Sequence, residues 1–286
     1  MLHIAVFLTL LGVSLQSASN VTLEGPDELI FGGSPAAAGQ YPFFVALQMN
    51  GYWHTCGGSL ISNWHVLTAA HCIWSPDSPY RFAYQAEQAF TQSYSIRMGT
   101  NLQTGGQTYR VSWAKVHPYY NRINLYNDIA VIGLAAPVQY NNLIKPIRLM
   151  RGRAGPQQAT AIGMGYMRYD PRTRPPSALS PNTLQQLPVT IDADWTCQSR
   201  LFPVHMRDFT LCLQGNRAGV LPGDSGSPVL ANRGNQWWQI GIASFADHMG
   251  YIKNLNGQTF APAGYVRVSS YCPFIAQVTR NMAWCQ

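Results

Sequence analysis

Charged side chains are scarce in this sequence of 286 residues: they make up 11% of it, with 19 Lys and Arg against 12 Asp and Glu, while apolar residues make up 47%. This balance excludes a disordered chain and predicts a packed globular protein. Cys-x-x-Cys spacings, fixed-period repeats, acidic clusters and nucleic-acid-binding motifs are lacking too. We therefore expect no cofactor, no metal site and no nucleic-acid partner, and only calcium dependence stays open.

The net charge of +7 is scattered, except for one group of arginines near the middle of the chain. We interpret this group as a solvated basic loop, with a site for anionic glycans or an acidic substrate as the alternative. Its members are Arg148, Arg151, Arg153, Arg168, Arg172 and Arg174.

Long apolar runs are missing except at the N-terminus. There an apolar core from Ile4 to Leu15 is followed by small residues, which is the layout of a cleaved signal peptide over residues 1–19, although His3 replaces the usual Lys or Arg. The run is too short to span a bilayer, and a buried N-terminal strand is the alternative. We expect a secreted, extracellular protein without membrane attachment after cleavage. Asn20 opens an N-glycosylation sequon, whose use stays open because it adjoins the cleavage point.

The rest of the chain consists of short apolar or alternating runs separated by Gly, Pro, Asn and Ser. Such runs indicate an all-β barrel or sandwich, and the length fits one large β domain or two ordinary ones. Helices are expected only after Ala193 and from Pro273 to about Ala283. The expected strands are Gly58 to Ile61, His65 to Ala69, Ser95 to Met98, Gln107 to Trp113, Ile129 to Leu134, Ala159 to Met164, Leu184 to Ile191, Pro228 to Ala231, Trp237 to Ser244 and Gly264 to Val268.

Two segments between these runs are expected to be irregular. Residues 141–153 divide the chain into nearly equal halves, and we interpret them as the connection between two domains. The stretch from Tyr169 to Pro181 contains four prolines, which predict a mobile loop without regular pairing.

The run from Pro222 to Pro228 is where the sequence first indicates chemistry. Ser225 lies between Gly223 and Gly226 in this run. Glycines allow a sharp bend there, which can expose the serine hydroxyl while backbone N–H groups converge on one point. An ordinary surface turn explains the run equally well. His71, next to Cys72, ends one apolar strand, and Asp128 opens another, yet either residue alone is more often structural.

Together, however, three segments in this order resemble the trypsin/chymotrypsin-like serine proteases: Leu67 to Cys72 (LTAAHC), Asn127 to Ala130 (NDIA) and Gly223 to Pro228 (GDSGSP). Ile30 to Gly33 resembles the family's mature start, and Cys56 to Leu60 its first cysteine loop. The resemblance implies an all-β fold of two antiparallel six-stranded β-barrels with a C-terminal helix. The implied divisions are a propeptide at 20–29, a first barrel at 30–144, a linker at 145–153, and a second barrel with the helix at 154–286.

The resemblance implies a serine endopeptidase. Ser225 would be the nucleophile, His71 the general base and then acid, and Asp128 the carboxylate that fixes the imidazole tautomer. The N–H groups of Gly223 and Ser225 would form the oxyanion hole. The resemblance also implies a monomer that acts on protein or peptide substrates and is bound by protein protease inhibitors. The alternative is a catalytically silent binding or regulatory protein, whereas a lipase or esterase is disfavoured because its serine precedes the other two residues in the chain.

Activation is implied to occur by cleavage before Ile30, whose new amino group would pair with Asp224. Leu29 stands where an Arg or Lys is usual. A trypsin-like activator is therefore not expected, and the activating protease stays unknown, with another protease or autolysis as the hypothesis.

Six cysteines in a secreted chain predict three disulfides, with free thiols as the alternative. The resemblance implies the pairs Cys56–Cys72 and Cys197–Cys212, which leaves Cys272–Cys285. One continuous helix would separate the last two by roughly 19 Å, at about 1.5 Å per residue, which is too far for a disulfide. Either the final turn folds back or these thiols pair otherwise.

The resemblance also implies a substrate pocket without charge. Gly219 falls where trypsin-like relatives have aspartate, and Leu221 replaces a cysteine that braces the pocket. Ala246 and Ala263 replace two wall glycines, which favours chymotrypsin- or elastase-like cleavage after small or medium apolar residues. The expected substrate-binding residues are Gly219, Ser244, Phe245, Ala246 and Ala263.

Residues 73–96 form a longer segment than the corresponding loop of typical relatives, and they are rich in aromatic residues. We interpret the segment as a surface insertion packed on itself. The alternative is a lid that selects extended substrates or inhibitors.

Overall fold

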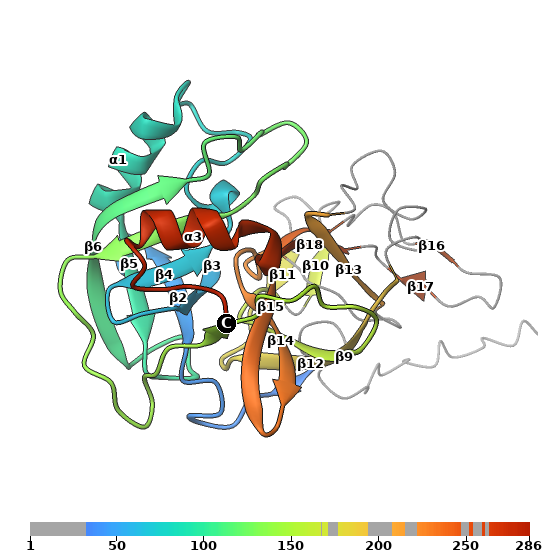
Figure 1. The fold of residues 1–286 in the computed structure, drawn as a ribbon. Coiled ribbons are helices and arrows are strands. Elements are labelled where there is room, and N and C mark those ends of the chain that lie inside the picture. The colour runs from blue at the N-terminus through green and yellow to red at the C-terminus, as the bar shows by residue number, and fades with distance from the viewer. Residues whose placement is uncertain are drawn as a thin grey trace, which may run out of the picture.

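Strands dominate the structure, and they close into two barrels (Figure 1). The computed structural model describes residues 33–166, 168–170, 177–193, 208–214, 222–246, 252–253, 259–260 and 263–286. Each barrel has six antiparallel strands, and a short helix lies near the C-terminus. The fold class expected from the sequence is thereby confirmed.

The first barrel has the strand order β2-β3-β4-β7-β6-β5. Its interior is apolar, and Val45, Leu47, Leu67 and Ile96 have no exposed surface, so burial of these inward-facing residues stabilises the barrel. The strands are β2 (Phe44–Met49), β3 (Trp53–Leu60), β4 (His65–Thr68), β5 (Tyr94–Met98), β6 (Gln107–Val116) and β7 (Ala130–Leu134).

The second barrel repeats this connectivity, because its first three strands in the sequence are followed around the barrel by the sixth, fifth and fourth. The strands are β9 (Gln158–Gly163), β12 (Gln185–Ile191), β13 (Thr210–Gln214), β14 (Pro228–Arg233), β15 (Gln236–Ala246) and β18 (Ala263–Arg267). Pairing of β9 with β12 closes the barrel.

Two single strands and two strand pairs are not part of the two closed barrels. Strand β1 (Ser34–Pro35) precedes the first barrel in the chain but pairs with β12 of the second. Strand β8 (Arg148–Leu149), in the connecting segment, runs parallel to β15. The remaining pairs are β10 (Arg168–Asp170) with β11 (Ser177–Leu179), and β16 (Ile252–Lys253) with β17 (Thr259–Phe260).

Each of the ten runs expected to be strands overlaps a strand of the structure. The expectation of an unpaired loop between Tyr169 and Pro181 is wrong, because β10 and β11 pair there. The four prolines of that stretch, at positions 171, 175, 176 and 181, fall outside the paired residues. The paired residues themselves therefore all have the backbone N–H that a strand needs.

A helix, α1 (Ala83–Ser93), occupies the insertion at 73–96 and was not expected. The Gln85 side chain accepts a hydrogen bond from the Phe82 N–H at 3.2 Å, which satisfies one donor at the helix start. Ala86 and Phe90 are four residues apart and buried, and the helix packs on β6 and β5. Comparison of the segment with a loop of typical relatives had led us to interpret it as a surface insertion, without a helix.

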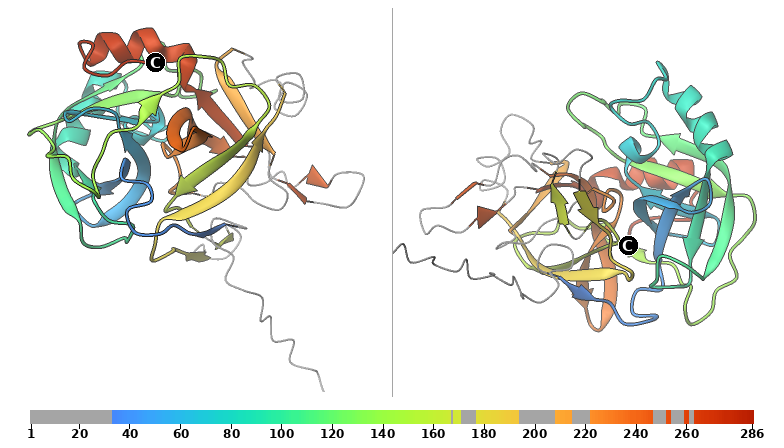
Figure 2. Two further views of the ribbon diagram at one scale, coloured as in Figure 1. Left: turned by 60° about the horizontal axis from the view of Figure 1, so that its bottom comes forward. Right: turned by 180° about the vertical axis from the view of Figure 1, so that it is seen from behind.

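The C-terminal helix, α3 (Cys272–Val278), is shorter than expected. The chain turns at Arg280 and Asn281, whose φ angles are +52° and +61°, and a disulfide joins Cys272 to Cys285 with their Cα atoms 5.6 Å apart. The final turn therefore folds back. Both views of Figure 2 place α3 on the side of the first barrel. The helix expected after Ala193 lies outside the described residues.

None of the helices in the described part of the chain combines the length and the apolar character that crossing a bilayer requires.

Candidate active site

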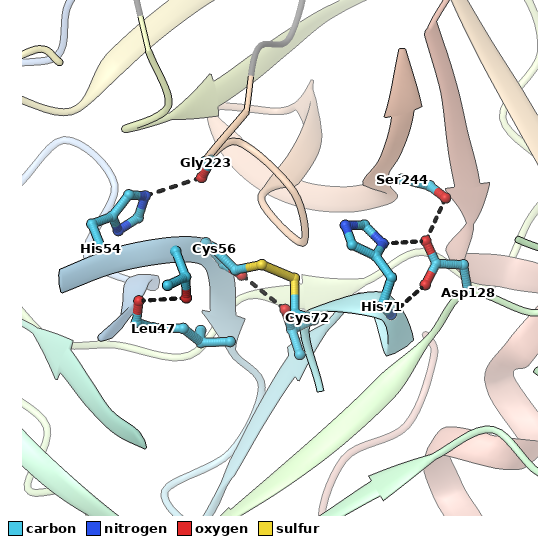
Figure 3. Close-up of a disulfide and its surroundings, with 11 residues drawn as sticks. Leu47, His54, Cys56, His71, Cys72, Asp128, Gly223 and Ser244 are labelled. Atoms are coloured by element: carbon cyan, nitrogen blue, oxygen red, sulfur yellow. Dashed lines mark hydrogen bonds and ion pairs between the residues drawn. A yellow bond between two sulfur atoms is a disulfide. The ribbon is translucent and has the colours of Figure 1, made fainter. Parts of the chain in front are cut away.

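Strands β4 and β7 bring His71 and Asp128 together. Thr68 pairs with Ala130, so the end of β4 and the start of β7 lie at one edge of the first barrel. His71 follows in the 3-10 helix η1 (Ala70–Cys72). The Asp128 carboxylate accepts hydrogen bonds from His71 Nδ1–H at 2.7 Å and from the His71 backbone N–H at 2.8 Å (Figure 3).

A disulfide fixes the residue after the histidine. Cys72 is bonded to Cys56 of β3, with the Cα atoms 6.2 Å apart, and Figure 3 shows this bridge beside His71. The link ties η1 to a barrel strand. The backbone that carries His71 is therefore held at both ends, by β4 and by the bridge.

Asp128 is fully buried between the two barrels. Ser244 of β15, in the second barrel, donates a hydrogen bond from its hydroxyl to Asp128 Oδ2 at 2.5 Å. With the two donors of His71, the carboxylate accepts three hydrogen bonds, which compensate for its removal from water. Sequence reasoning expected the segment of Ser244 to pair with the substrate backbone, and this stays a prediction. The structure adds the contact of the Ser244 side chain with the carboxylate.

The imidazole of His71 has a raised pKa. Burial by itself lowers this pKa, because it disfavours the charged ring, but the charge and the hydrogen bond of Asp128 raise it more. The side chain keeps 17% of its surface exposed, while that of Asp128 keeps none. The pair therefore has one buried, negative end and one end that solvent or a substrate can reach.

The turn from Pro222 to Ser227 is fastened to both barrels. The Gly57 N–H donates to the Ser225 carbonyl at 2.8 Å, and the Gly226 N–H donates to the Ala243 carbonyl at 2.8 Å. Gly226 has a φ of +79°, and a Cβ there would lie 2.1 Å from Thr68 Oγ1. Only glycine fits this position without strain.

These contacts place Ser225 beside the segment that leads to His71. Its neighbour Gly226 lies against Thr68 and Ala69, since a Cβ on it would be 3.2 Å from the Ala69 nitrogen. Ser225 is half-buried. Among the hydrogen bonds of the described residues, none joins Ser225 Oγ to His71, and the contacts that hold the serine near this segment are those of the backbone of its turn. Such hydrogen bonds are often long without substrate.

A second histidine, His54, holds this turn, and sequence reasoning missed it. Its Nε2 lies 3.0 Å from the Gly223 carbonyl oxygen, as Figure 3 shows. Burial lowers the pKa of His54 to about 4, although the hydrogen bond to Gly223 raises it somewhat, so the ring is neutral at pH 7 and donates through Nε2–H. Gly223 has a φ of +98°, which favours glycine. The only sequence signal was a histidine two residues before Cys56.

Asp224 is fully buried beneath the turn. Its Oδ1 accepts a hydrogen bond from the Gly165 N–H at 2.7 Å. Glycine is required at 163 and 165, because a Cβ at either position would lie within 2.5 Å of the Asp224 carboxylate group. Ile30, the residue predicted to pair with Asp224, lies outside the described residues.

The structure describes part of the predicted substrate pocket. Ala246 and Ala263 pair at the adjoining ends of β15 and β18. The ring of Phe245 covers Gly264, where a Cβ would lie 2.1 Å from Phe245 Cζ. Gly219 lies outside the described residues, as do Leu221 and Cys197. Cys212, the predicted partner of Cys197, is disulfide-bonded.

A metal has no evident place among the described residues. The one group with suitable spacing there consists of Cys56, His71 and Cys72. Both sulfurs are engaged in the disulfide, so they cannot act as thiolate ligands.

Comparison with known proteins adds independent information. The family model described as Trypsin matches residues 30–275. Chymotrypsin-C of Rattus norvegicus is 34% identical over 256 residues, which cover 86% of this chain and 87% of that protein. Transmembrane protease serine 9 of Rattus norvegicus is 30% identical over 257 residues, which cover 88% of this chain but only 22% of that relative. The chain thus spans about a fifth of the length of the second relative.

Proposed function

The chain belongs to the trypsin family of serine proteases, and from this premise we propose that it is a secreted endopeptidase that cleaves peptide bonds through Ser225, His71 and Asp128. The observation that carries the proposal is the hydrogen-bonded pair of His71 and Asp128, at 2.7 Å, beside the turn of Ser225. This pair supplies a base and the charge that orients it.

In the proposed reaction, Ser225 Oγ attacks the carbonyl carbon of the substrate while its proton passes to His71 Nε2. The buried Asp128 carboxylate stabilises the resulting imidazolium. The N–H groups of Gly223 and Ser225 are proposed to bind the oxyanion, and losing one such donor typically costs a factor of about 100 or more in rate. His71 then protonates the leaving amine, an acyl-enzyme remains on Ser225, and water hydrolyses it in the reverse sense.

A fluorophosphonate probe tests this proposal, because it phosphonylates only an activated serine. We expect native protein that begins at Ile30 to form one adduct, mapped by mass spectrometry to Ser225, and Ser225→Ala to form none. A folded native protein without an adduct would favour the alternative, a catalytically silent member of the family that binds other proteins.

We also propose that the enzyme prefers small or medium apolar residues before the scissile bond. The support is the uncharged Gly219 at the expected pocket floor and the paired Ala246 and Ala263 at its expected wall. A library of peptide substrates should be cleaved after Leu, Met or Ala. A profile dominated by Arg or Lys would contradict this preference and would direct attention to Asp247.

Secretion with a signal at 1–19 and activation by cleavage after Leu29 complete the proposal. Asp224 supports it, because a buried carboxylate under the turn could receive the Ile30 amino group. N-terminal sequencing of active protein from culture medium should read Ile-Phe-Gly-Gly. Any other start in fully active protein would rule out this activation model.

A further inference from the structure

A groove of about 720 Å³, lined by no residue of the Ser225 turn, lies between α3 and the outside of the first barrel. Figure 1 shows α3 crossing this barrel. Trp64 and Trp113 line the groove on the barrel side, and Phe274, Val278 and Met282 line it on the helix side. Its volume falls within the range of small-molecule sites, roughly 300 to 1,000 Å³. The proteolytic mechanism leaves this groove without a role.

The floor of the groove depends on a glycine. Gly133 of β7 pairs with His65 of β4, and the Trp113 indole covers Gly133 so closely that a Cβ there would lie 2.1 Å from Trp113 Cε2. The indole also meets the His65 ring, with the ring centroids 5.6 Å apart. Because Gly133 has no side chain, the Trp113 indole can lie directly against the backbone of β7.

The ionisable side chains that line the groove are all basic. They are His65, Lys115 and Arg280, and no carboxylate is among them. Lys115 Nζ lies 3.5 Å from Glu87 Oε2, and burial lowers the pKa of His65. Arg280 is exposed and makes no ion pair with the described residues. It lies two residues after the end of α3, with a φ of +52° that is rare outside glycine, and it lines the groove.

We propose that this groove binds a small organic anion with an apolar body. The body would lie against the two indoles and Val278, where burial of apolar surface and ring stacking stabilise it. The acidic group would lie at Arg280, whose planar guanidinium suits a carboxylate or sulfonate. A cationic ligand does not fit, because Arg280 would repel it, whereas the charge of Lys115 is paired with Glu87. The proposal goes beyond proteolysis and does not depend on it.

Two fluorescent probes with almost the same rings test the proposal: 8-anilinonaphthalene-1-sulfonate, an anion, and N-phenyl-1-naphthylamine, its counterpart without the sulfonate. We expect the native protein to bind one molecule of the anion, about threefold to tenfold more tightly than the neutral amine. Arg280→Gln should abolish this difference by weakening only the anion. Gln277→Trp, at an exposed position of α3 that lines the groove, should fill it and weaken both probes.

Arg233→Gln is the matched control, because Arg233 is an exposed arginine outside the groove, at the end of β14. It should change neither affinity, and circular dichroism should show that all three variants are folded. Equal affinities of the two probes for the native protein would overturn the proposal. So would an absence of binding, unchanged binding to a folded Gln277→Trp, or an effect of Arg233→Gln equal to that of Arg280→Gln.

Discussion

His54 Nε2 lies 3.0 Å from the carbonyl oxygen of Gly223, so a side chain of the first barrel holds the turn that carries Ser225 in the second. The contact requires a buried imidazole, and burial lowers its pKa from 6.5 to about 4. The turn thus depends on a histidine that resists protonation.

Stability should fall in mild acid because of His54. Its folded pKa is below its unfolded value, so its contribution is complete above pH 6.5 and is lost as the pH falls toward 4. The loss amounts to at most about 3 kcal/mol. Urea unfolding at several pH values should show a smaller acid loss for His54→Gln, which retains an N–H donor but does not titrate. Equal pH dependence in both proteins would contradict this role.

Replacing Asp128 should remove the orientation of His71 while leaving the shape of the site. Asp128→Asn has nearly the same volume, but its amide donates a hydrogen bond where the carboxylate accepts one, and the wrong imidazole tautomer is favoured. We expect kcat to fall by about four orders of magnitude, the size attributed to this change in the family. Steady-state hydrolysis of a peptide ester measures it. Ser244→Ala, which removes one of three donors to Asp128, is the milder comparison.

The rate of peptide hydrolysis should rise with pH through the pKa of His71. The base must be neutral, and its pKa lies above the ordinary 6.5 because of Asp128, so the midpoint of kcat/KM should also lie above 6.5. The free energy of unfolding changes with pH in the opposite direction from the rate. The contribution of the pair to it is full below pH 6.5 and is lost as the pH rises through the folded pKa. NMR titration of the ring in Ser225→Ala, which cannot digest itself, should give a raised midpoint, and a midpoint below 6.5 would contradict the assignment.

Gly226→Ala should damage both folding and activity. Its methyl group would approach the Gly57 carbonyl oxygen to 2.4 Å, at a φ of +79°, and relief of this clash would move Ser225. We expect a loss of about 3 kcal/mol or more in the free energy of unfolding. Gly234→Ala is the control, because its φ is +58° and nothing lies within 4 Å. Backbone strain alone should cost it about 1 kcal/mol, with full activity, as thermal unfolding and hydrolysis assays can show.

The sequence by itself determined the positions of most strands. Alternation of apolar residues and the turn residues between them are local properties, and each run from Gly58 to Val268 that carried this pattern overlaps a strand. The three motifs around His71, Asp128 and Ser225 also determined the family, which the comparison with known proteins confirms.

Other features were decided only by tertiary structure. Helix α1 depends on packing of Ala86 and Phe90 against β6, and the C-terminal chain folds back because Cys272 bonds to Cys285. The hydrogen bonds from Ser244 to Asp128 and from His54 to Gly223 each cross between the barrels, over separations of 116 and 169 residues. The local sequence pattern does not predict such contacts, because they form only when the two closed barrels pack against each other.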